Sequence, residues 1–223
     1  MQMLTISHIR RQPLYFSSII LLFAGGLCLA LLFDKREIFI RLNAFHCPAT
    51  DTFFSAYIET GNGCFLLLLV LIFIIRKRWL LSLHCVSAFL LSGLLVQIVK
   101  RIFVMPRPGA VFSQASDLFI SGYHIHQGHN SFPSGHTATA FALVTVCTLY
   151  LSCRWRGLIL FILATLTGFS RVYLGQHFFG DVLAGATIGV GCAFLVCYAI
   201  RADGLQKLKK QKSENQADRL QSA

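Results

Sequence analysis

A histidine and a carboxylate four residues apart are the first residues of this chain with evident chemical use. His177 and Asp181 stand at the start of an apolar run that is expected to be helical, and residues at i and i+4 share one face of a helix. A carboxylate beside one ring nitrogen fixes the tautomer of a histidine and makes the other nitrogen a better nucleophile. His136, in a Pro-Ser-Gly-His sequence, could transfer a proton. These residues offer a nucleophile, its partner and an acid/base.

A second group of residues suits an oxyanion. Lys100, Arg107 and Arg171 are cations, and the two guanidinium groups can hold phosphate oxygens bidentately. Ser134 and Gly135 precede the first turn of an expected helix, where free N–H groups and the helix dipole attract anions. We therefore predict a pocket for a tetrahedral oxyanion. The cations can neutralise charge on phosphorus themselves, so we expect no metal and no other cofactor.

The elements that must position these residues are apolar helices. The chain has 223 residues, of which 55% are hydrophobic and 13% charged, too apolar a composition for a soluble domain of this size. A helix needs roughly 20 apolar residues to span a bilayer, and six stretches approach that length. They are residues 15–33, 54–75, 79–99, 136–152, 157–173 and 177–200. We predict an all-α fold: an integral membrane bundle of six transmembrane helices in a single domain, residues 1–200.

The positive charge gives the expected orientation. A net charge of +11 could indicate a nucleic-acid partner, but the Lys and Arg residues form short clusters between apolar runs, which is typical of membrane topology signals and contacts to anionic head groups. With the N-terminus inside, 13 of the 20 Lys and Arg residues fall in cytoplasmic segments. We expect a cell (inner) membrane protein with both termini in the cytoplasm and no nucleic-acid partner. The loops 34–53, 100–135 and 174–176 would face outward, and the basic tail, 201–223, would be disordered.

This topology places the chemical residues on one membrane face, in three segments. The segments read Lys-x6-Arg-Pro from Lys100, Pro-Ser-Gly-His from Pro133, and Ser-Arg-x5-His-x3-Asp from Ser170. In this order they resemble the signature of the type-2 phosphatidic acid phosphatase superfamily, which includes membrane lipid phosphatases, soluble acid phosphatases and vanadium haloperoxidases. The resemblance implies phosphate binding by Lys100, Arg107 and Arg171, with help from Ser134 and Gly135. It also implies that His177 is a phosphohistidine nucleophile, His136 an acid/base and Asp181 the partner of His177.

The function predicted from these features is a membrane lipid phosphatase that hydrolyses a phosphate monoester or diphosphate. Its substrate would be a lipid in the same leaflet: undecaprenyl diphosphate, lipid A, phosphatidylglycerol phosphate or phosphatidate. One alternative is a lipid phosphotransferase that uses the same site. Another is a small anion or lipid transporter, but this requires further charges along a path, and the fourth to sixth expected spans hold almost none. No obligate protein partner is indicated.

Two groups of possible metal ligands fit simpler interpretations. His124, His126 and His129 form an HxHxxH run in a polar loop, where solvated side chains are more common than a metal site, and a role in substrate recognition or pH response is a further alternative. Most of the eight cysteines fall in apolar runs without any CxxC pair, as small buried hydrophobic residues do.

Overall fold

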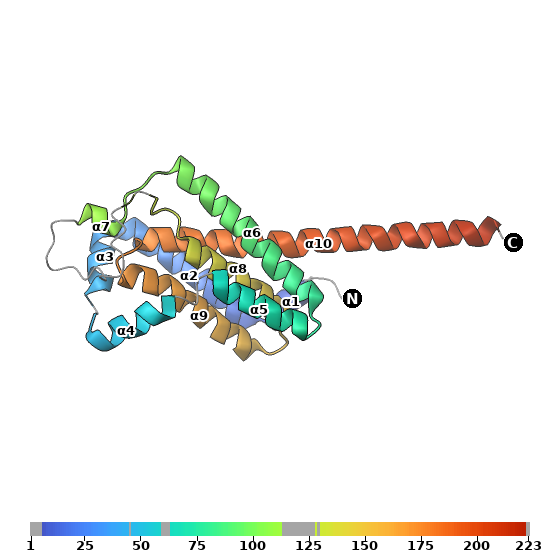
Figure 1. Cartoon of the computed structure of the whole chain (residues 1–223), viewed down its shortest axis with the longest axis horizontal. Coiled ribbons are helices and arrows are strands. Elements are labelled where there is room, and N and C mark those ends of the chain that lie inside the picture. Colours follow the sequence, from blue (N-terminus) through green and yellow to red (C-terminus); the bar gives the residue numbers. More distant parts are fainter. Residues whose placement is uncertain (1–5, 45, 59–62, 113–127, 129, 222–223) are drawn as a thin grey trace.

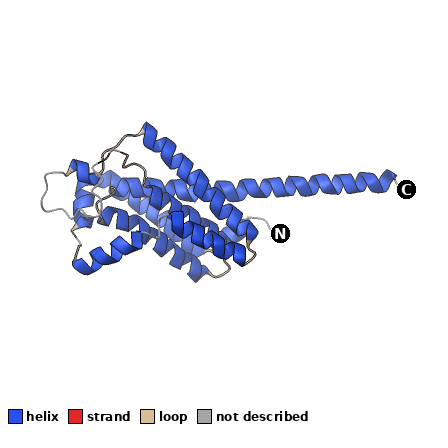
Figure 2. Cartoon of the chain, in the orientation of Figure 1, coloured by secondary structure: helices blue, strands red, loops and turns tan. Residues whose placement is uncertain are grey.

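The computed structural model describes residues 6–44, 46–58, 63–112, 128 and 130–221, and within these residues the chain forms helices and loops without a strand (Figure 2). Side chains are described only as far as residue 200. The helices are α1 (Ile6–Arg11), α2 (Pro13–Leu32), α3 (Lys35–Asn43), α4 (Pro48–Tyr57), α5 (Gly63–Ile75), α6 (Trp79–Ile102), α7 (Pro108–Val111), α8 (Gly135–Tyr150), α9 (Arg154–Tyr173) and α10 (Phe179–Gln221).

Four of the described helices are long and apolar enough to cross a membrane. They are α2, α6, α9 and the Phe179–Ile200 part of α10. The apolar part of α5, Phe65–Ile75, and the 16 residues of α8 are shorter than a full span. The predicted all-α membrane fold is thus confirmed, whereas the predicted number of six transmembrane helices is not.

Two predicted segments can be compared with the helices of the structure. Within the predicted span 54–75, the structure describes the end of α4, to Tyr57, and α5, from Gly63, and residues 59–62 lie outside its described part. The composition of the tail predicts disorder from residue 201, but the backbone of α10 continues as helix to Gln221. Beyond Gly204 this segment has no further Gly or Pro, and its Lys, Gln, Glu and Leu residues are good helix formers.

Helix α8 is the centre of the bundle and packs against α6, α9 and α10. Two glycines on α10 permit the approach of α10 to α8. A Cβ at Gly185 would overlap the carbonyl oxygen of Ser134, and one at Gly189 would overlap that of Ala138. Small residues spaced by four let two helix backbones come together in this way. The contact brings the first turn of α8, and hence His136, beside the first turn of α10.

The three motif segments lie at one end of the bundle (Figure 1). Helices α3 and α7, the C-terminal end of α6 and the first turns of α8 and α10 gather there. The N-terminal helix α1 and the extension of α10 lie toward the opposite end.

Candidate functional site

A tight turn between α9 and α10 sets the position of His177. The N–H of Gly175 donates to the carbonyl of Val172 at 3.0 Å, and the N–H of Gln176 donates to that of Arg171 at 2.9 Å. This pair of bonds is a Schellman motif, and Gly175 holds the left-handed position with φ of 72°. The N–H of His177 also reaches the Arg171 carbonyl, at 3.2 Å. The turn therefore brings Arg171 and His177 together.

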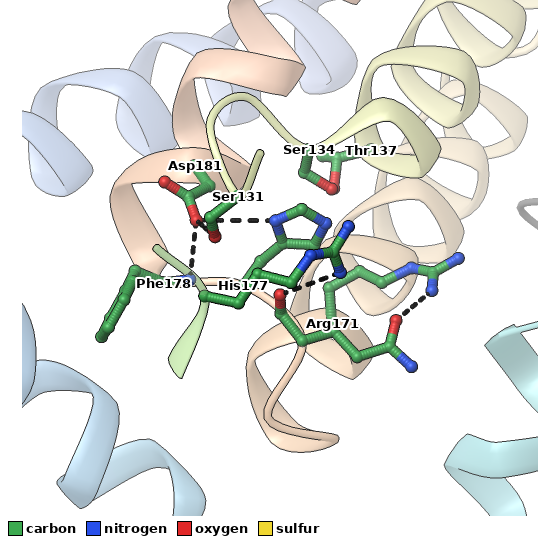
Figure 3. Close-up of polar contacts among 9 residues, drawn as sticks. Ser131, Ser134, Thr137, Arg171, His177, Phe178 and Asp181 are labelled. Atoms are coloured by element: carbon green, nitrogen blue, oxygen red, sulfur yellow. Dashed lines mark hydrogen bonds and ion pairs between the residues drawn. The ribbon is translucent and has the colours of Figure 1, made fainter. Parts of the chain in front are cut away.

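His177, in the turn two residues before α10, and Asp181, in the first turn of that helix, form a buried pair (Figure 3). Nδ1 of His177 lies 3.5 Å from Oδ2 of Asp181, long for a hydrogen bond but within ion-pair distance. The same Oδ2 accepts hydrogen bonds from the N–H of Phe178, at 2.9 Å, and from the hydroxyl of Ser131. Burial lowers the pKa of His177 to about 4, so the ring is neutral near pH 7. Its Nε2 atom, which points away from Asp181, can act as a nucleophile.

The three cations surround this pair from different elements. Lys100, in the last turn of α6, interacts electrostatically with Arg107, Arg171 and Asp181. Gln176 links the two arginines: its backbone carbonyl accepts from Nη1 of Arg107 at 3.4 Å, and its side-chain oxygen accepts from Nη1 of Arg171. Burial lowers the pKa of Arg107, but a guanidinium stays charged in proteins. The site therefore concentrates positive charge beside the His177 ring.

The first turn of α8 completes the site. The half-buried His136 interacts electrostatically with Arg171, His177 and Lys100. Ser134 is fully buried, and its hydroxyl accepts from Thr137 at 2.8 Å. The backbone N–H of Ser134 donates to the carbonyl of Asp181 at 2.9 Å. This corrects one expectation: the N–H of Ser134 is not free for an anion, so any backbone donor in this turn begins at Gly135.

The structure thus brings the residues predicted from sequence to one end of the bundle. They come from α6, α8, α9 and α10, from the residue before α7 (Arg107) and from the turn before α10 (His177). Sequence reasoning missed two others, Ser131 and Gln176, which contact the predicted residues. Their only sequence signal is closeness to Pro133 and His177, and nothing in that signal identifies their partners. The His124, His126 and His129 run lies outside the described residues.

Comparison with known proteins identifies the family. The PAP2 superfamily model matches residues 81–204, a segment that contains every predicted site residue. A lipid A 4'-phosphatase of Bacteroides thetaiotaomicron is 28% identical over 161 residues, which cover 69% of this chain and 71% of that protein.

Two solved structures share the fold. The crystal structure of LpxE from Aquifex aeolicus aligns with a TM-score of 0.65 and 32% identity, covering 74% of this chain and 96% of that one. A PAP2-type phosphatidylglycerolphosphate phosphatase from Bacillus subtilis aligns with a TM-score of 0.62 and 26% identity, covering 84% of this chain and 94% of that one. The family match, the ordered motifs and the apolar helices confirm the resemblance stated above: the chain belongs to the PAP2 superfamily and is a multi-pass membrane phosphatase that hydrolyses phosphoric esters.

Proposed function

We propose that this enzyme removes phosphate from a lipid phosphate monoester or diphosphate through a phosphohistidine intermediate on His177. The observation that carries the proposal is the buried His177–Asp181 pair, with Nδ1 and Oδ2 at 3.5 Å, beside Lys100, Arg107 and Arg171. A neutral ring whose Nε2 faces a cluster of cations is arranged to attack a bound phosphate.

In the first step, Nε2 of His177 forms a bond to phosphorus while the bond to the leaving oxygen breaks. Burial and the neighbouring cations lower the pKa of His136 in the free enzyme, and the negative charge of a bound phosphate favours its protonated form. The protonated ring gives its proton to the leaving oxygen, so the lipid departs as an alcohol or as a lower phosphate. Asp181 stabilises the positive charge that develops on the His177 ring. The cations stabilise the equatorial oxygens of the transition state, where charge builds up. Ser134 and Gly135 contribute to the same phosphate pocket.

In the second step, water replaces the histidine on phosphorus. His136, now neutral, takes a proton from the water as the new P–O bond forms and the P–N bond to His177 breaks. Inorganic phosphate leaves, and both histidines return to their starting states. One residue thus acts as acid and then as base, a role worth about 10²–10⁴-fold in rate.

The location of the site supports a lipid substrate. The reacting residues stand at the ends of apolar helices, where the head group of a lipid in the same leaflet can reach them while its tails remain in the bilayer. Similar proteins include a lipid A phosphatase and a phosphatidylglycerolphosphate phosphatase. Undecaprenyl diphosphate and phosphatidate are the other candidates. Outward orientation of the site would favour undecaprenyl diphosphate and lipid A in a Gram-negative cell.

The test is a panel of these four lipid phosphates, assayed by phosphate release with the purified wild type and His177→Ala. We expect the wild type to release phosphate from at least one lipid and the variant to release none. The variant should remain folded, as judged by thermal melting and gel filtration. A folded variant with full activity would refute the phosphohistidine mechanism.

Two inhibitors test the same site chemistry. Vanadate adopts the five-coordinate geometry of phosphorus during transfer, so we expect it to compete with substrate. Activity should survive EDTA, because fixed cations of the chain stabilise the phosphate. Loss of activity on chelation, restored by a divalent metal, would instead point to the HxHxxH segment.

A further inference from the structure

Ser131 makes a contact that the signature motifs do not explain. Its side chain is fully buried, and its hydroxyl donates a hydrogen bond to Oδ2 of Asp181. That oxygen is the one that lies 3.5 Å from Nδ1 of His177. The second donor to Oδ2 is the N–H of Phe178, which belongs to the same turn as Asp181. Among the described residues, Ser131 supplies the donor that reaches this carboxylate from another part of the fold.

The backbone of Ser131 fixes where that hydroxyl lies. The N–H of Ser131 donates to the carbonyl of Met105 at 2.9 Å, and the N–H of Asn130 donates to the same carbonyl at 3.0 Å. Met105 lies between Lys100 and Arg107 in the chain. Ser131 is thus bonded to the first motif segment through its backbone and to the third through its side chain, and it precedes the second by two residues.

We propose that Ser131 is a positioning residue for the reaction, whose hydroxyl holds the Asp181 carboxylate in the orientation that faces Nδ1 of His177. This inference rests on the proposed role of His177 as nucleophile. Ser131 does not touch phosphate and acts through Asp181. A carboxylate held only by Phe178 would be free to turn about its side-chain bonds, and His177 would lose its fixed partner.

The hydroxyl also affects charge at the pair. A hydrogen bond to a carboxylate stabilises its ionised form. Without this bond, the charge of the Asp181 carboxylate is less stabilised, and the carboxylate holds a proton on the adjacent His177 ring more strongly. The fraction of enzyme with a neutral His177 ring then falls. Loss of the hydroxyl should therefore move the acid side of the pH profile to higher pH.

The experiment compares three variants of the full-length protein in detergent with the wild type, using the lipid that the wild type hydrolyses best. Ser131→Ala removes the donor, and Ser131→Thr retains a hydroxyl. Ser92→Ala is the matched control, because Ser92 is also fully buried but its hydroxyl donates to the carbonyl of Phe89 in its own helix, at 3.1 Å, and not to a site residue described in the structure. Thermal melting of each variant reports folding, and kcat and KM are measured across pH.

For Ser131→Ala we expect kcat to fall roughly 10-fold to 100-fold, since a hydrogen bond to a charged group is worth about 1.5–3 kcal/mol. KM should stay within about twofold, because the phosphate-binding cations are intact. The acid limb of kcat/KM should move to higher pH. Ser131→Thr should recover much of kcat, and Ser92→Ala should match the wild type.

Three results would overturn the proposal. The first is wild-type kcat with an unmoved acid limb in Ser131→Ala. The second is a loss of kcat that is equal at every pH and equal in Ser131→Thr, which indicates a structural role only. The third applies if Ser131→Ala does not fold. In that case, a folded Ser131→Thr that loses kcat and has a shifted acid limb, although it keeps a hydroxyl, would contradict the proposal. If His177→Ala is inactive while Ser131→Ala is fully active, the role of Ser131 fails and the proposed function stands.

Discussion

The charge on His177 decides whether its ring can attack phosphorus, because only the neutral ring has a free lone pair on Nε2. Burial is the largest cause of the shift in its pKa to about 4, and Asp181 opposes it. The ring therefore becomes protonated as pH falls through about 4, well below the ordinary value of 6.5. The free enzyme should keep its nucleophile throughout the mildly acidic range.

The pKa of His177 predicts the position of the acid limb of kcat/KM, because this ratio reports ionisations of the free enzyme and free substrate. We expect the limb that belongs to His177 near pH 4. Two lipid phosphates whose phosphate groups differ in pKa distinguish ionisation of the substrate from ionisation of the enzyme. An acid limb caused by the substrate differs between the two lipids, whereas one caused by the enzyme stays at the same pH. A common limb near pH 6.5 for both substrates would contradict a buried, neutral His177.

Arg171 should not tolerate lysine. Its side chain is buried, and one nitrogen of the guanidinium is engaged by Gln176. The planar group can bond to Gln176 and phosphate together, whereas an ammonium cannot reproduce that geometry. We expect Arg171→Lys to lower kcat/KM by about 10-fold to 100-fold, the loss of one charge-assisted hydrogen bond. Arg101→Lys is the control, since Arg101 is exposed beside Lys100; equal losses in the two variants would contradict the prediction.

At this scale, the sequence could predict residues whose type and spacing are distinctive. His177 and Asp181 are four apart, a spacing that predicts a shared helix face; the structure brings them together, but with His177 in the turn that precedes α10. Ser131 gives no such signal, because its hydroxyl acts on a carboxylate 50 residues away. Gln176 is similar: its bonds to Arg107 and Arg171 depend on how α6, α9 and the turn after α9 pack. Tertiary contacts of ordinary polar residues cannot be predicted from local spacing.

At the scale of helices, the sequence predicted well where the long apolar helices lie. It predicted less well where one helix ends and the next begins. Long apolar runs indicated α2, α6, α9 and the start of α10 because lipid requires backbone hydrogen bonds within the segment. Hydropathy could not separate α4 from α5, since the polar interruption between them is short. It also could not show that α8, with only 16 residues, is the buried centre of the bundle, because centrality depends on contacts with three other helices.

The contact between α8 and α10 depends on two glycines, and substitutions there should separate the catalytic elements. Alanine at Gly185 would push against Ser134 in the phosphate pocket, and alanine at Gly189 would push against Ala138 one turn further along. We expect each to destabilise the protein by about 1–3 kcal/mol, measured by thermal melting. Gly185→Ala should also lower kcat/KM more than Gly189→Ala, because it displaces Ser134 directly.

The control for these variants is Gly191→Ala, on the same helix. A Cβ at Gly191 meets no atom within 4 Å, so this variant should melt with the wild type and keep its activity. If all three alanine variants behaved alike, helix propensity and not backbone contact would explain the effects. Unchanged melting of Gly185→Ala and Gly189→Ala would show that α8 and α10 do not pack this closely.

For the molecule as a whole, the fold fixes which parts share an end, and the charges predict which end faces the cytoplasm. The site segments lie at one end of the bundle, and both α1 and the extension of α10 lie toward the other (Figure 1). The α5–α6 and α8–α9 connections lie at the same end as α1 (Figure 1). They carry Arg76, Lys77 and Arg78 before α6, and Arg154 and Arg156 at the start of α9. Because Lys and Arg accumulate in cytoplasmic loops, this end should be cytoplasmic and the site outward.

Reporter fusions test that orientation in a bacterial cell. Green fluorescent protein fused after Ala223 should fluoresce, because it folds in the cytoplasm, and alkaline phosphatase fused after Phe112, next to α7, should be active, because it matures only after export. Fusions after Arg78 provide the internal control, with fluorescence and no alkaline phosphatase activity. The reverse pattern would place His177 on the cytoplasmic face. The substrate would then have to be a lipid phosphate of the inner leaflet, and the outer-leaflet candidates undecaprenyl diphosphate and lipid A would lose their advantage over phosphatidylglycerol phosphate and phosphatidate.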